Sequence, residues 1–362
     1  MSTDPRATRQ AALRELLREE GVDALLVTHL PNVRYLTGFS GSAGLLLVGP
    51  AATTLVTDFR YAAQAPQEVG NAAAVAIDAT STWDRLQRLV AAEPIARLGI
   101  EAHALTVRDA ERVSAATRAA VAPTGELVER LRAAKDPREI AAIRAAATLA
   151  QEALAEVLPT VRVGQSELEI GAALEAALRR RGSEWHPFQT IVASGPRSAL
   201  PHARTSAREL ARGDWLLLDF GAQVDGYCAD LTRTVVVGAR ADERQLATYE
   251  AVRDAQRRAL TQVRAGMAGR EADALARDLL AARGLGEAFG HSLGHGLGLE
   301  VHEAPRLSQT ADQPLPLHAV VTIEPGVYFP GWGGVRLEDD VHLGPNGPEL
   351  LSDGRTELVE LL

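Results

Sequence analysis

The first third of the chain alternates between helical and strand-like spacing of hydrophobic positions. Apolar residues recur at helical spacing over residues 6–20, and Gly21 follows as a natural helix stop. Short apolar runs separated by turn residues predict strands at residues 23–28, 44–48, 53–57, 74–78 and 97–101, with helical stretches around 59–68 and 81–92. Strands alternating with helices indicate a small α/β domain. We expect it to end by about residue 125, near the turn signal Ala122–Gly125.

A charged, alanine-rich stretch follows, and its composition strongly favours helix. Asp136 and Pro137 predict a helix start, with Asp136 as the N-cap and Pro137 in the first turn. A chain of 362 residues is too long for one ordinary core, so two domains are expected. We place the boundary within residues 129–135, which predicts domains of residues 1–128 and 129–362.

The second domain opens with helices and then changes to strands and glycines. A helix is expected at residues 166–181. Apolar runs at residues 215–224 and 227–237 flank Asp225-Gly226, a dipeptide typical of a β-hairpin. Two helices at residues 242–264 and 270–283, and strands at 320–327 and 335–343, complete the pattern. This order predicts an α+β domain in which helices back an antiparallel sheet.

Composition and charge narrow the function classes. The net charge is −9 and the pI is near 5.6, which argues against a nucleic-acid partner and against docking on an anionic membrane. The single cysteine, Cys228, allows no intrachain disulfide and no cysteine-rich metal motif. The polar N-terminus has no signal-peptide pattern, and no run of about 18 apolar residues predicts a membrane span. We expect a cytoplasmic protein.

Two aspartates stand on the arms of the predicted hairpin. Asp219 ends an apolar strand, and Asp230 lies on the returning arm. The turn brings the two carboxylates to within about a residue of opposite each other. Two carboxylates this close repel unless one is protonated or a cation lies between them. For Asp219 alone, a plain solvated turn residue is an equal alternative.

Histidines and further acids gather in the last third of the chain. His291, His295 and His302 lie within twelve residues, and glycines flank His295, which allows close backbone approach and an unhindered imidazole. Glu324 ends an apolar strand before a Pro-Gly turn. Glu338 follows Arg336 by two residues, on the same strand face, so this pair alone favours a structural ion pair. His202, in a loop sequence, is uninformative by itself.

These residues together predict a metal centre. Asp219, Asp230, His295, Glu324 and Glu338 supply four carboxylates and one imidazole, with no sulfur. This set suits Mn²⁺, Co²⁺ or Zn²⁺ in a catalytic site, and carboxylates able to bridge suit two ions better than one. Two ions about 3.5–4 Å apart are a common device for hydrolysis.

The motifs that carry these residues resemble those of the "pita-bread" metallopeptidases, which include methionine aminopeptidase, aminopeptidase P, prolidase and metal-free creatinase. The motifs are LDFG, DLTRT, GHGLGLEVHE, TIEPGVY and GVRLEDD, in this order from residue 218 to residue 340. The resemblance covers the chain from about residue 136 onward and includes all five ligand positions. It implies a creatinase-like N-terminal domain followed along the chain by a pita-bread catalytic domain.

The resemblance also implies a role for each residue. Asp230 and Glu338 would bridge two divalent ions, Mn²⁺ first, with Zn²⁺ and Co²⁺ as alternatives. Asp219 would bind one ion, and His295 and Glu324 the other. Glu324 would act as general base, and His302 would stabilise the oxyanion. His291 and His202 would line the substrate side, and Arg336 would orient the bridging carboxylate.

The resemblance leaves two peptidase activities open, which differ in the length of the peptide substrate. The segment Asn32–Val48, with its GFSGSAG stretch, is similar to aminopeptidase P, which removes an N-terminal residue preceding proline, and we favour that reading. Arg306 lies where prolidases hold the dipeptide carboxylate, so an Xaa-Pro dipeptidase is the alternative. A non-catalytic binding module is a remote third reading, because relatives of that kind are expected to have lost ligands. The N-terminal domain predicts a homodimer or higher homo-oligomer.

Overall fold

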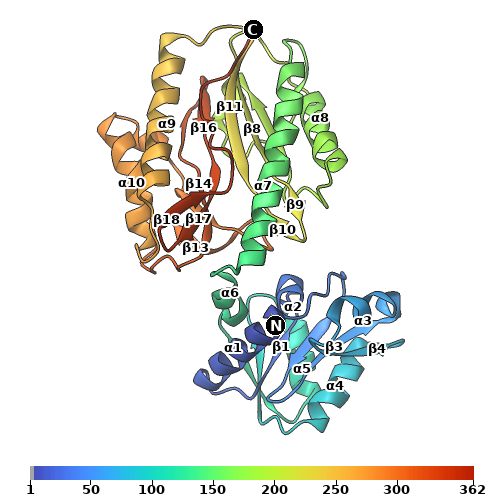
Figure 1. Ribbon diagram of the computed structural model, residues 1–362. Helices are drawn as coiled ribbons and strands as arrows, with labels where there is room; N and C mark the ends of the chain where they lie inside the picture. Colours follow the sequence, from blue (N-terminus) through green and yellow to red (C-terminus); the bar gives the residue numbers. More distant parts are fainter. Residues whose placement is uncertain (1–3) are drawn as a thin grey trace. The chain divides into compact units, whose positions relative to one another are not determined.

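The structure, a computed structural model, describes residues 4–362. The chain forms two compact units, one ending at Arg132 and the other running from Ala133 to Leu362 (Figure 1). The division follows α6 (Leu127–Arg132), which stays with the first unit because buried Arg132 donates to Asn32 Oδ1 at 2.8 Å. No helix among the described residues is long and apolar enough to cross a membrane.

The first unit is a six-stranded sheet with strand order β4-β3-β2-β1-β5-β6. Its strands are β1 (Ala24–Val27), β2 (Leu45–Val48), β3 (Thr53–Asp58), β4 (Ala74–Asp78), β5 (Arg97–Glu101) and β6 (Ala120–Thr124). Its helices before α6 are α1 (Pro5–Glu19), α2 (Leu30–Thr37), η1 (Phe59–Tyr61), α3 (Gln64–Val69), α4 (Thr82–Ala92) and α5 (Val107–Ala116). Side chains of α4 and α5 pack with alternate residues of β1 and β2, while α1 and α2 pack on β1. The predicted α/β architecture is confirmed.

Three details of the first unit differ from the sequence-based expectation, and one of them is the helix α5, which was not predicted. Residues 122–125 do not form the expected turn, because Ala122–Thr124 extend β6 in parallel pairing with β5. Pro123 is tolerated there since β6 is an edge strand, where a missing N–H breaks no ladder bond. The helix α2 was not predicted. It is short and its N-cap, His29, makes no side-chain capping bond, so local signals are weak.

The second unit contains two larger sheets between two pairs of helices (Figure 1). One sheet has the order β19-β11-β8-β7, from β7 (Ile191–Ser194), β8 (Trp215–Phe220), β11 (Leu231–Val237) and β19 (Glu360–Leu361). The other has the order β13-β12-β14-β17-β18, from β12 (Gly294–Gly296), β13 (Glu303–Leu307), β14 (Val320–Ile323), β17 (Asp339–Gly344) and β18 (Gly347–Leu350). Short hairpins add β9 (Gln223–Val224) with β10 (Tyr227–Cys228), and β15 (Gly326–Phe329) with β16 (Gly333–Arg336).

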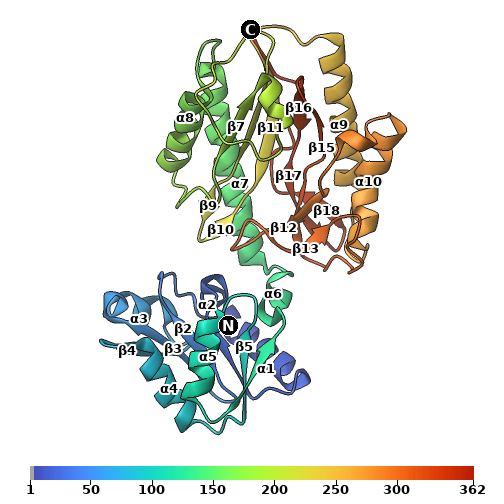
Figure 2. The ribbon, with the colours of Figure 1, turned by 180° about the vertical axis from the view of Figure 1, so that it is seen from behind.

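The helices of this unit bury one face of each sheet. The pair α7 (Pro137–Val157) and α8 (Glu167–Arg180) packs on β8 and β11. The pair α9 (Glu243–Gln262) and α10 (Gly269–Ala282) packs on β14, β15 and β16, and Figure 2 shows these strands from behind. Short 3₁₀ turns are η2 (Leu158–Thr160), η3 (Gly195–Ala199) and η4 (Gly286–Ala288). Asp136 caps α7 as predicted, through a full capping box with Glu139.

Four strand predictions in this unit were too long, and one of them, residues 335–343, divides into β16 and β17 at Leu337-Glu338. The hairpin arms at residues 215–224 and 227–237 each break near their middle, at Gly221-Ala222 and at Ala229-Asp230. A Cβ on Gly221 would lie 2.2 Å from Ala229 O, so glycine permits the close backbone approach. The strand expected at residues 320–327 likewise ends at Ile323 and restarts at Gly326. Asp230 and Glu324 lie at these breaks, outside the regular ladders, whereas Asp219 stays within β8.

Candidate metal centre

The hairpin places the two aspartates on one face with a two-residue offset. Asp219 in β8 lies opposite Thr232 in β11, and Asp230 immediately precedes β11. The offset is diagonal rather than the expected near-opposite pairing, because the two-residue turn at Asp225-Gly226 pairs Val224 with Tyr227, and the same register continues to set Asp219 opposite Thr232. Diagonal neighbours on one face still lie within reach of each other.

The second sheet and the β16–β17 connection bring the other three residues to the same place. His295 lies in β12, Glu324 follows β14, and Glu338 lies between β16 and β17. His295 Nε2 is 3.3 Å from Glu324 Oε1 and 3.8 Å from Asp230 Oδ2. Ligand atoms of Asp230, His295 and Glu338 all lie within 4.8 Å of one another. Glu324 joins this group through His295.

Burial makes this group of acids electrostatically costly. Burial first, and then the charges of Glu338 and Asp219, raise the pKa of Asp230 well above its usual value. Burial and the charges of Glu324 and Asp219 do the same to the pKa of Glu338. Burial, reinforced by Asp219, raises the pKa of Glu324 to about 7. Such carboxylates are ionised together only when a cation compensates them.

Two oxygens in this group are buried without a hydrogen-bond partner among the described residues. They are Asp219 Oδ1 and Asp230 Oδ1, one on each arm of the hairpin. Buried polar atoms of folded proteins almost always have a partner, and a bound ion is one accepted partner for an exception. The orphaned oxygens therefore fit a divalent cation held by this cluster.

The imidazole of His295 is prepared to act as a ligand. Burial lowers the pKa of His295 to about 3, so the ring is neutral near pH 7. Its Nδ1 lies 3.1 Å from the backbone oxygen of Gly296. We assign the proton to Nδ1, which donates to that carbonyl and leaves the Nε2 lone pair facing the acids.

Arg336 contacts a different acid from the one expected. Its Nη2 donates to Asp219 Oδ2 at 2.5 Å rather than to a bridging carboxylate. It reaches Glu338 only through Thr232, whose hydroxyl accepts from Arg336 Nε at 3.1 Å and donates to Glu338 Oε2 at 2.6 Å. The sequence spacing of Arg336 and Glu338 was misleading because β16 ends at Arg336 and the chain turns before Glu338.

The remaining predicted histidines surround this cluster at different depths. The His302 ring centroid lies 4.3 Å from that of His295, and His302 is exposed. His291 Nε2 bonds to Tyr328 Oη at 2.9 Å, and burial lowers the pKa of His291 to about 4. His202 is exposed in the loop after η3. All three lie near enough for their charges to couple, because His202 contributes to the pKa of both His291 and His302.

The sequence analysis missed three residues that support the cluster. Thr232 links Arg336 to Glu338, as described above. Tyr328 Oη accepts from Arg336 Nη1 at 2.7 Å and contacts His291. Asp340 Oδ2 accepts from the backbone N–H of Asp230 at 3.1 Å. All three fall inside the quoted motifs, and period-two alternation puts Thr232 on the face of Asp230.

A second group of acids with a histidine lies in the first unit. Glu101, His103 and Glu129 also bring ligand atoms within 4.8 Å. Both Glu101 oxygens already accept hydrogen bonds, Oε1 from Asn32 Nδ2 at 2.7 Å and Oε2 from two backbone N–H groups. The same Asn32 amide donates to Glu129 Oε1, which also faces His103 Nε2 at 3.0 Å. Glu129 Oε2 is also buried without a hydrogen-bond partner among the described residues, but the other carboxylate oxygens of this group are already engaged, so we assign the metal centre to the second unit.

The buried cluster of carboxylates and a histidine in the second unit fits a metallohydrolase, and comparison with known proteins identifies the family. Residues 141–345 match metallopeptidase family M24, and residues 9–134 match the creatinase/prolidase N-terminal domain. The chain belongs to metallopeptidase family M24. It is a metallopeptidase, and the predicted creatinase-like and pita-bread domains are confirmed.

Relatives match over nearly the whole chain. An Xaa-Pro dipeptidase from Pyrococcus horikoshii is 36% identical, covering 95% of this chain and 97% of its own. The structure of an Xaa-Pro dipeptidase from Bacillus anthracis superposes with a TM-score of 0.96 at 40% identity, covering 98% of this chain and 100% of that one. An X-Pro aminopeptidase from Thermotoga maritima gives 0.90 at 37% identity, covering 97% and 99%.

Proposed function

We propose that this metallopeptidase hydrolyses the peptide bond that precedes proline, with two divalent ions bound by Asp219, Asp230, His295, Glu324 and Glu338. The observation that carries the metal assignment is the pair of orphaned, buried carboxylate oxygens beside a neutral imidazole. Four carboxylates, each of which can bind two ions at once, suit a two-ion site. Mn²⁺ is the first choice, with Zn²⁺ or Co²⁺ as alternatives. When bound, the ions would polarise the substrate carbonyl and lower the pKa of a water molecule. The proline preference is supported by the names of the relatives.

The chain's own residues would divide the proton and charge chemistry. Glu324, whose pKa burial raises to about 7, is suited to take a proton from the nucleophile and return it to the proline nitrogen. His302, exposed beside His295, is placed to donate a hydrogen bond to the developing oxyanion. His291 and His202 would contact the substrate, and Tyr328 would hold His291 in place.

Packing within the first unit accounts for the GFSGSAG stretch that favoured aminopeptidase P. Phe39 is buried and meets Tyr61 edge to face, with ring centroids 5.2 Å apart. A Cβ on Gly41 would lie 2.2 Å from the Phe39 ring, so this position requires glycine. Ser42 N donates to Tyr61 Oη at 3.0 Å. Because these contacts explain the pattern structurally, the stretch is weak support for the longer-peptide hypothesis.

The position of Arg306 favours dipeptides. Arg306 in β13 lies directly opposite His295 in β12, and opposite residues of antiparallel strands share a face. Arg306 is exposed. The pKa of His302 is lowered first by the burial of His302 and then by the charge of Arg306. A guanidinium on this face is a good partner for the free carboxylate of an Xaa-Pro dipeptide. We therefore propose Xaa-Pro dipeptidase activity first and Xaa-Pro aminopeptidase activity as the alternative.

Substrate length tests this choice. We expect the kcat/KM for Ala-Pro to exceed that for Ala-Pro-Ala at least about tenfold, since only the dipeptide places a carboxylate beside Arg306. Arg306→Ala is expected to lower dipeptide turnover about 10- to 100-fold and tripeptide turnover much less. Arg270→Ala, at an exposed arginine paired with Asp312, is the matched control and should change neither rate. Strong tripeptide turnover without dipeptide turnover would select the aminopeptidase, and hydrolysis of neither would refute the proposed function.

A further inference from the structure

Glu167 is a buried carboxylate outside the metal cluster. It is the first residue of α8, directly after the N-cap Ser166, and its side chain is 0% exposed. Burying a charge is costly unless it is paired and hydrogen-bonded. Arg197 Nε lies 3.2 Å from Glu167 Oε2, and the N-terminus of α8 adds a favourable dipole. The other contacts of this carboxylate indicate what it holds.

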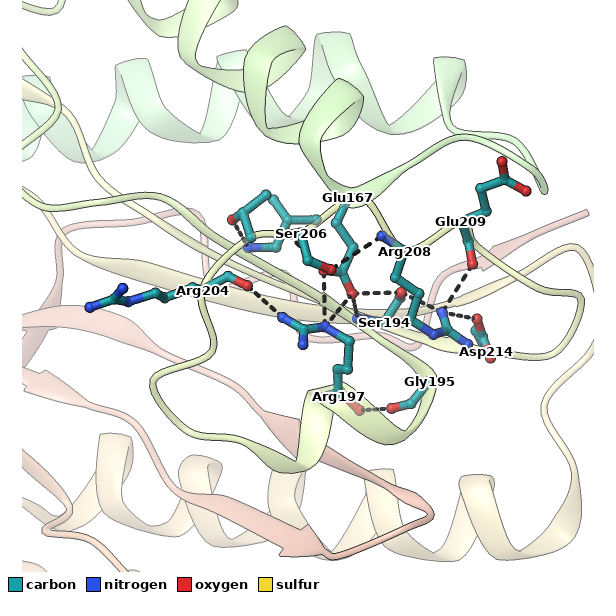
Figure 3. A network of polar contacts seen from close by, with 12 residues as sticks. Glu167, Ser194, Gly195, Arg197, Arg204, Ser206, Arg208, Glu209 and Asp214 are labelled. Carbon is teal, nitrogen blue, oxygen red and sulfur yellow. Dashed lines mark hydrogen bonds and ion pairs between the residues drawn. The ribbon is translucent and has the colours of Figure 1, made fainter.

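The two oxygens of Glu167 hold both ends of one segment, residues 194–206, which we call the 194–206 loop (Figure 3). Oε1 accepts from the backbone N–H and the hydroxyl of Ser194, each at 2.8 Å. Oε2 accepts from the backbone N–H and the hydroxyl of Ser206, at 3.0 and 2.6 Å. Arg197 ties the middle of the loop by donating Nη2 to Arg204 O at 2.5 Å. One side chain therefore closes the loop at its base.

The far side of the 194–206 loop contacts the residues that shape the metal cluster. Arg336 Nη1 donates to Pro201 O at 3.3 Å, while Nη2 of the same guanidinium donates to Asp219. Gly334 N, in β16, donates to Ser198 Oγ at 2.8 Å. Glu167 thus fixes the loop at its base, and the hydrogen bonds to Ser198 and Pro201 hold its tip beside the metal cluster.

His202 lies next to Pro201 at this tip. Among residues 4–362, no hydrogen bond or ion pair holds the exposed His202 ring. The position of the ring is therefore set by the backbone of the loop that carries it. Any loosening of the loop base moves His202 relative to Asp219 and Arg336.

We propose that Glu167 is a positioning residue, which acts on catalysis by fixing the 194–206 loop so that His202 faces the substrate. The proposal rests on the proposed function, in which His202 contacts the peptide. Glu167 touches no reacting atom, and its effect passes through His202. A displacement of about 1 Å in a catalytic group is enough to lower rates about 100-fold.

The first test is Glu167→Gln, which replaces one acceptor oxygen with an NH₂ group that cannot accept, so that one end of the loop loses its acceptor and Arg197 loses the opposing charge. We expect kcat/KM for an Xaa-Pro peptide to fall about 10- to 100-fold, with bound metal unchanged. Glu169→Gln is the matched control. Glu169 lies on the same helical turn and caps Ser166 at the surface, so activity should stay within about twofold. Wild-type kcat/KM in Glu167→Gln would overturn the proposal.

A double-mutant cycle with His202→Ala separates positioning from general stability. If Glu167 acts through His202, Glu167→Gln should lower kcat/KM no more than about threefold further in the His202→Ala background. A merely structural role predicts the full 10- to 100-fold loss in both backgrounds, and that result would also overturn the proposal. Should Glu167→Gln fail to fold, Ser206→Ala removes one loop contact and keeps the carboxylate. It should show a smaller loss that likewise vanishes without His202.

Amide hydrogen exchange keeps this test separate from the proposed function. In the full-length protein, amides of residues 195–205 should exchange faster in Glu167→Gln than in wild type or Glu169→Gln. Unchanged exchange would show that Glu167 does not anchor the loop. If the wild type hydrolyses no Xaa-Pro peptide, the proposed function fails, while the exchange result still decides whether Glu167 fixes the loop.

Discussion

Replacing Glu338 with alanine is expected to lower kcat/KM by about 10⁴-fold or more, equivalent to at least about 5 kcal/mol of transition-state stabilisation. Glu338 contributes a ligand atom to the tightest part of the cluster, within 4.8 Å of those of Asp230 and His295. In the proposed function it binds both ions, so its loss removes a shared ligand. Steady-state kinetics with an Xaa-Pro dipeptide measures the effect.

The variant should still fold, because it removes one of several mutually repelling buried acids. Burial and the charges of Glu324 and Asp219 raise the pKa of Glu338 well above its usual value, which shows how unfavourable its ionised form is without a cation. Its metal-free thermal midpoint should therefore stay close to that of the metal-free wild type. Glu349→Ala, at an exposed acid paired with Arg144, is the control and should remain active. Wild-type rates in Glu338→Ala would disprove the assigned centre.

Removal of divalent ions by a chelator is expected to abolish activity, and Mn²⁺ should restore it. The orphaned oxygens of Asp219 and Asp230 have no other compensation among the described residues. Rebinding should also stabilise the fold, by about 2.7 kcal/mol at 100 times the dissociation constant. Activity and thermal midpoint are followed through removal and readdition, with Glu338→Ala as the variant that Mn²⁺ does not rescue. Full activity in the chelated protein would contradict the metal mechanism.

Much of the cluster could be predicted from the sequence because its residues lie at strand ends with local signals. Asp219 and Asp230 flank a hairpin dipeptide, and Glu324 precedes a Pro-Gly break. The glycines on either side of His295 allow neighbouring backbone segments to approach closely, as expected. A Cβ on Gly294 would lie 2.0 Å from Thr322 O, and one on Gly296 would lie 2.2 Å from Ala304 O.

Features that depend on contacts between distant segments could not be predicted. Arg336 binds Asp219 because β8 and β16 lie side by side, although 117 residues separate the pair. In the local sequence, Glu167 is an ordinary acidic residue in the first turn of a helix, next to the N-cap Ser166. Its burial arises only when the 194–206 loop folds over it.

The number of ions bound at full activity tests the central claim most directly. The metal-free protein is titrated with Mn²⁺ while bound metal and hydrolysis of an Xaa-Pro dipeptide are measured on the same samples. Shared ligation by Asp230 and Glu338 predicts saturation of activity at two ions per chain and loss of this stoichiometry in Glu338→Ala. Full activity with no bound ion, or with two ions retained in an active Glu338→Ala variant, would contradict the account.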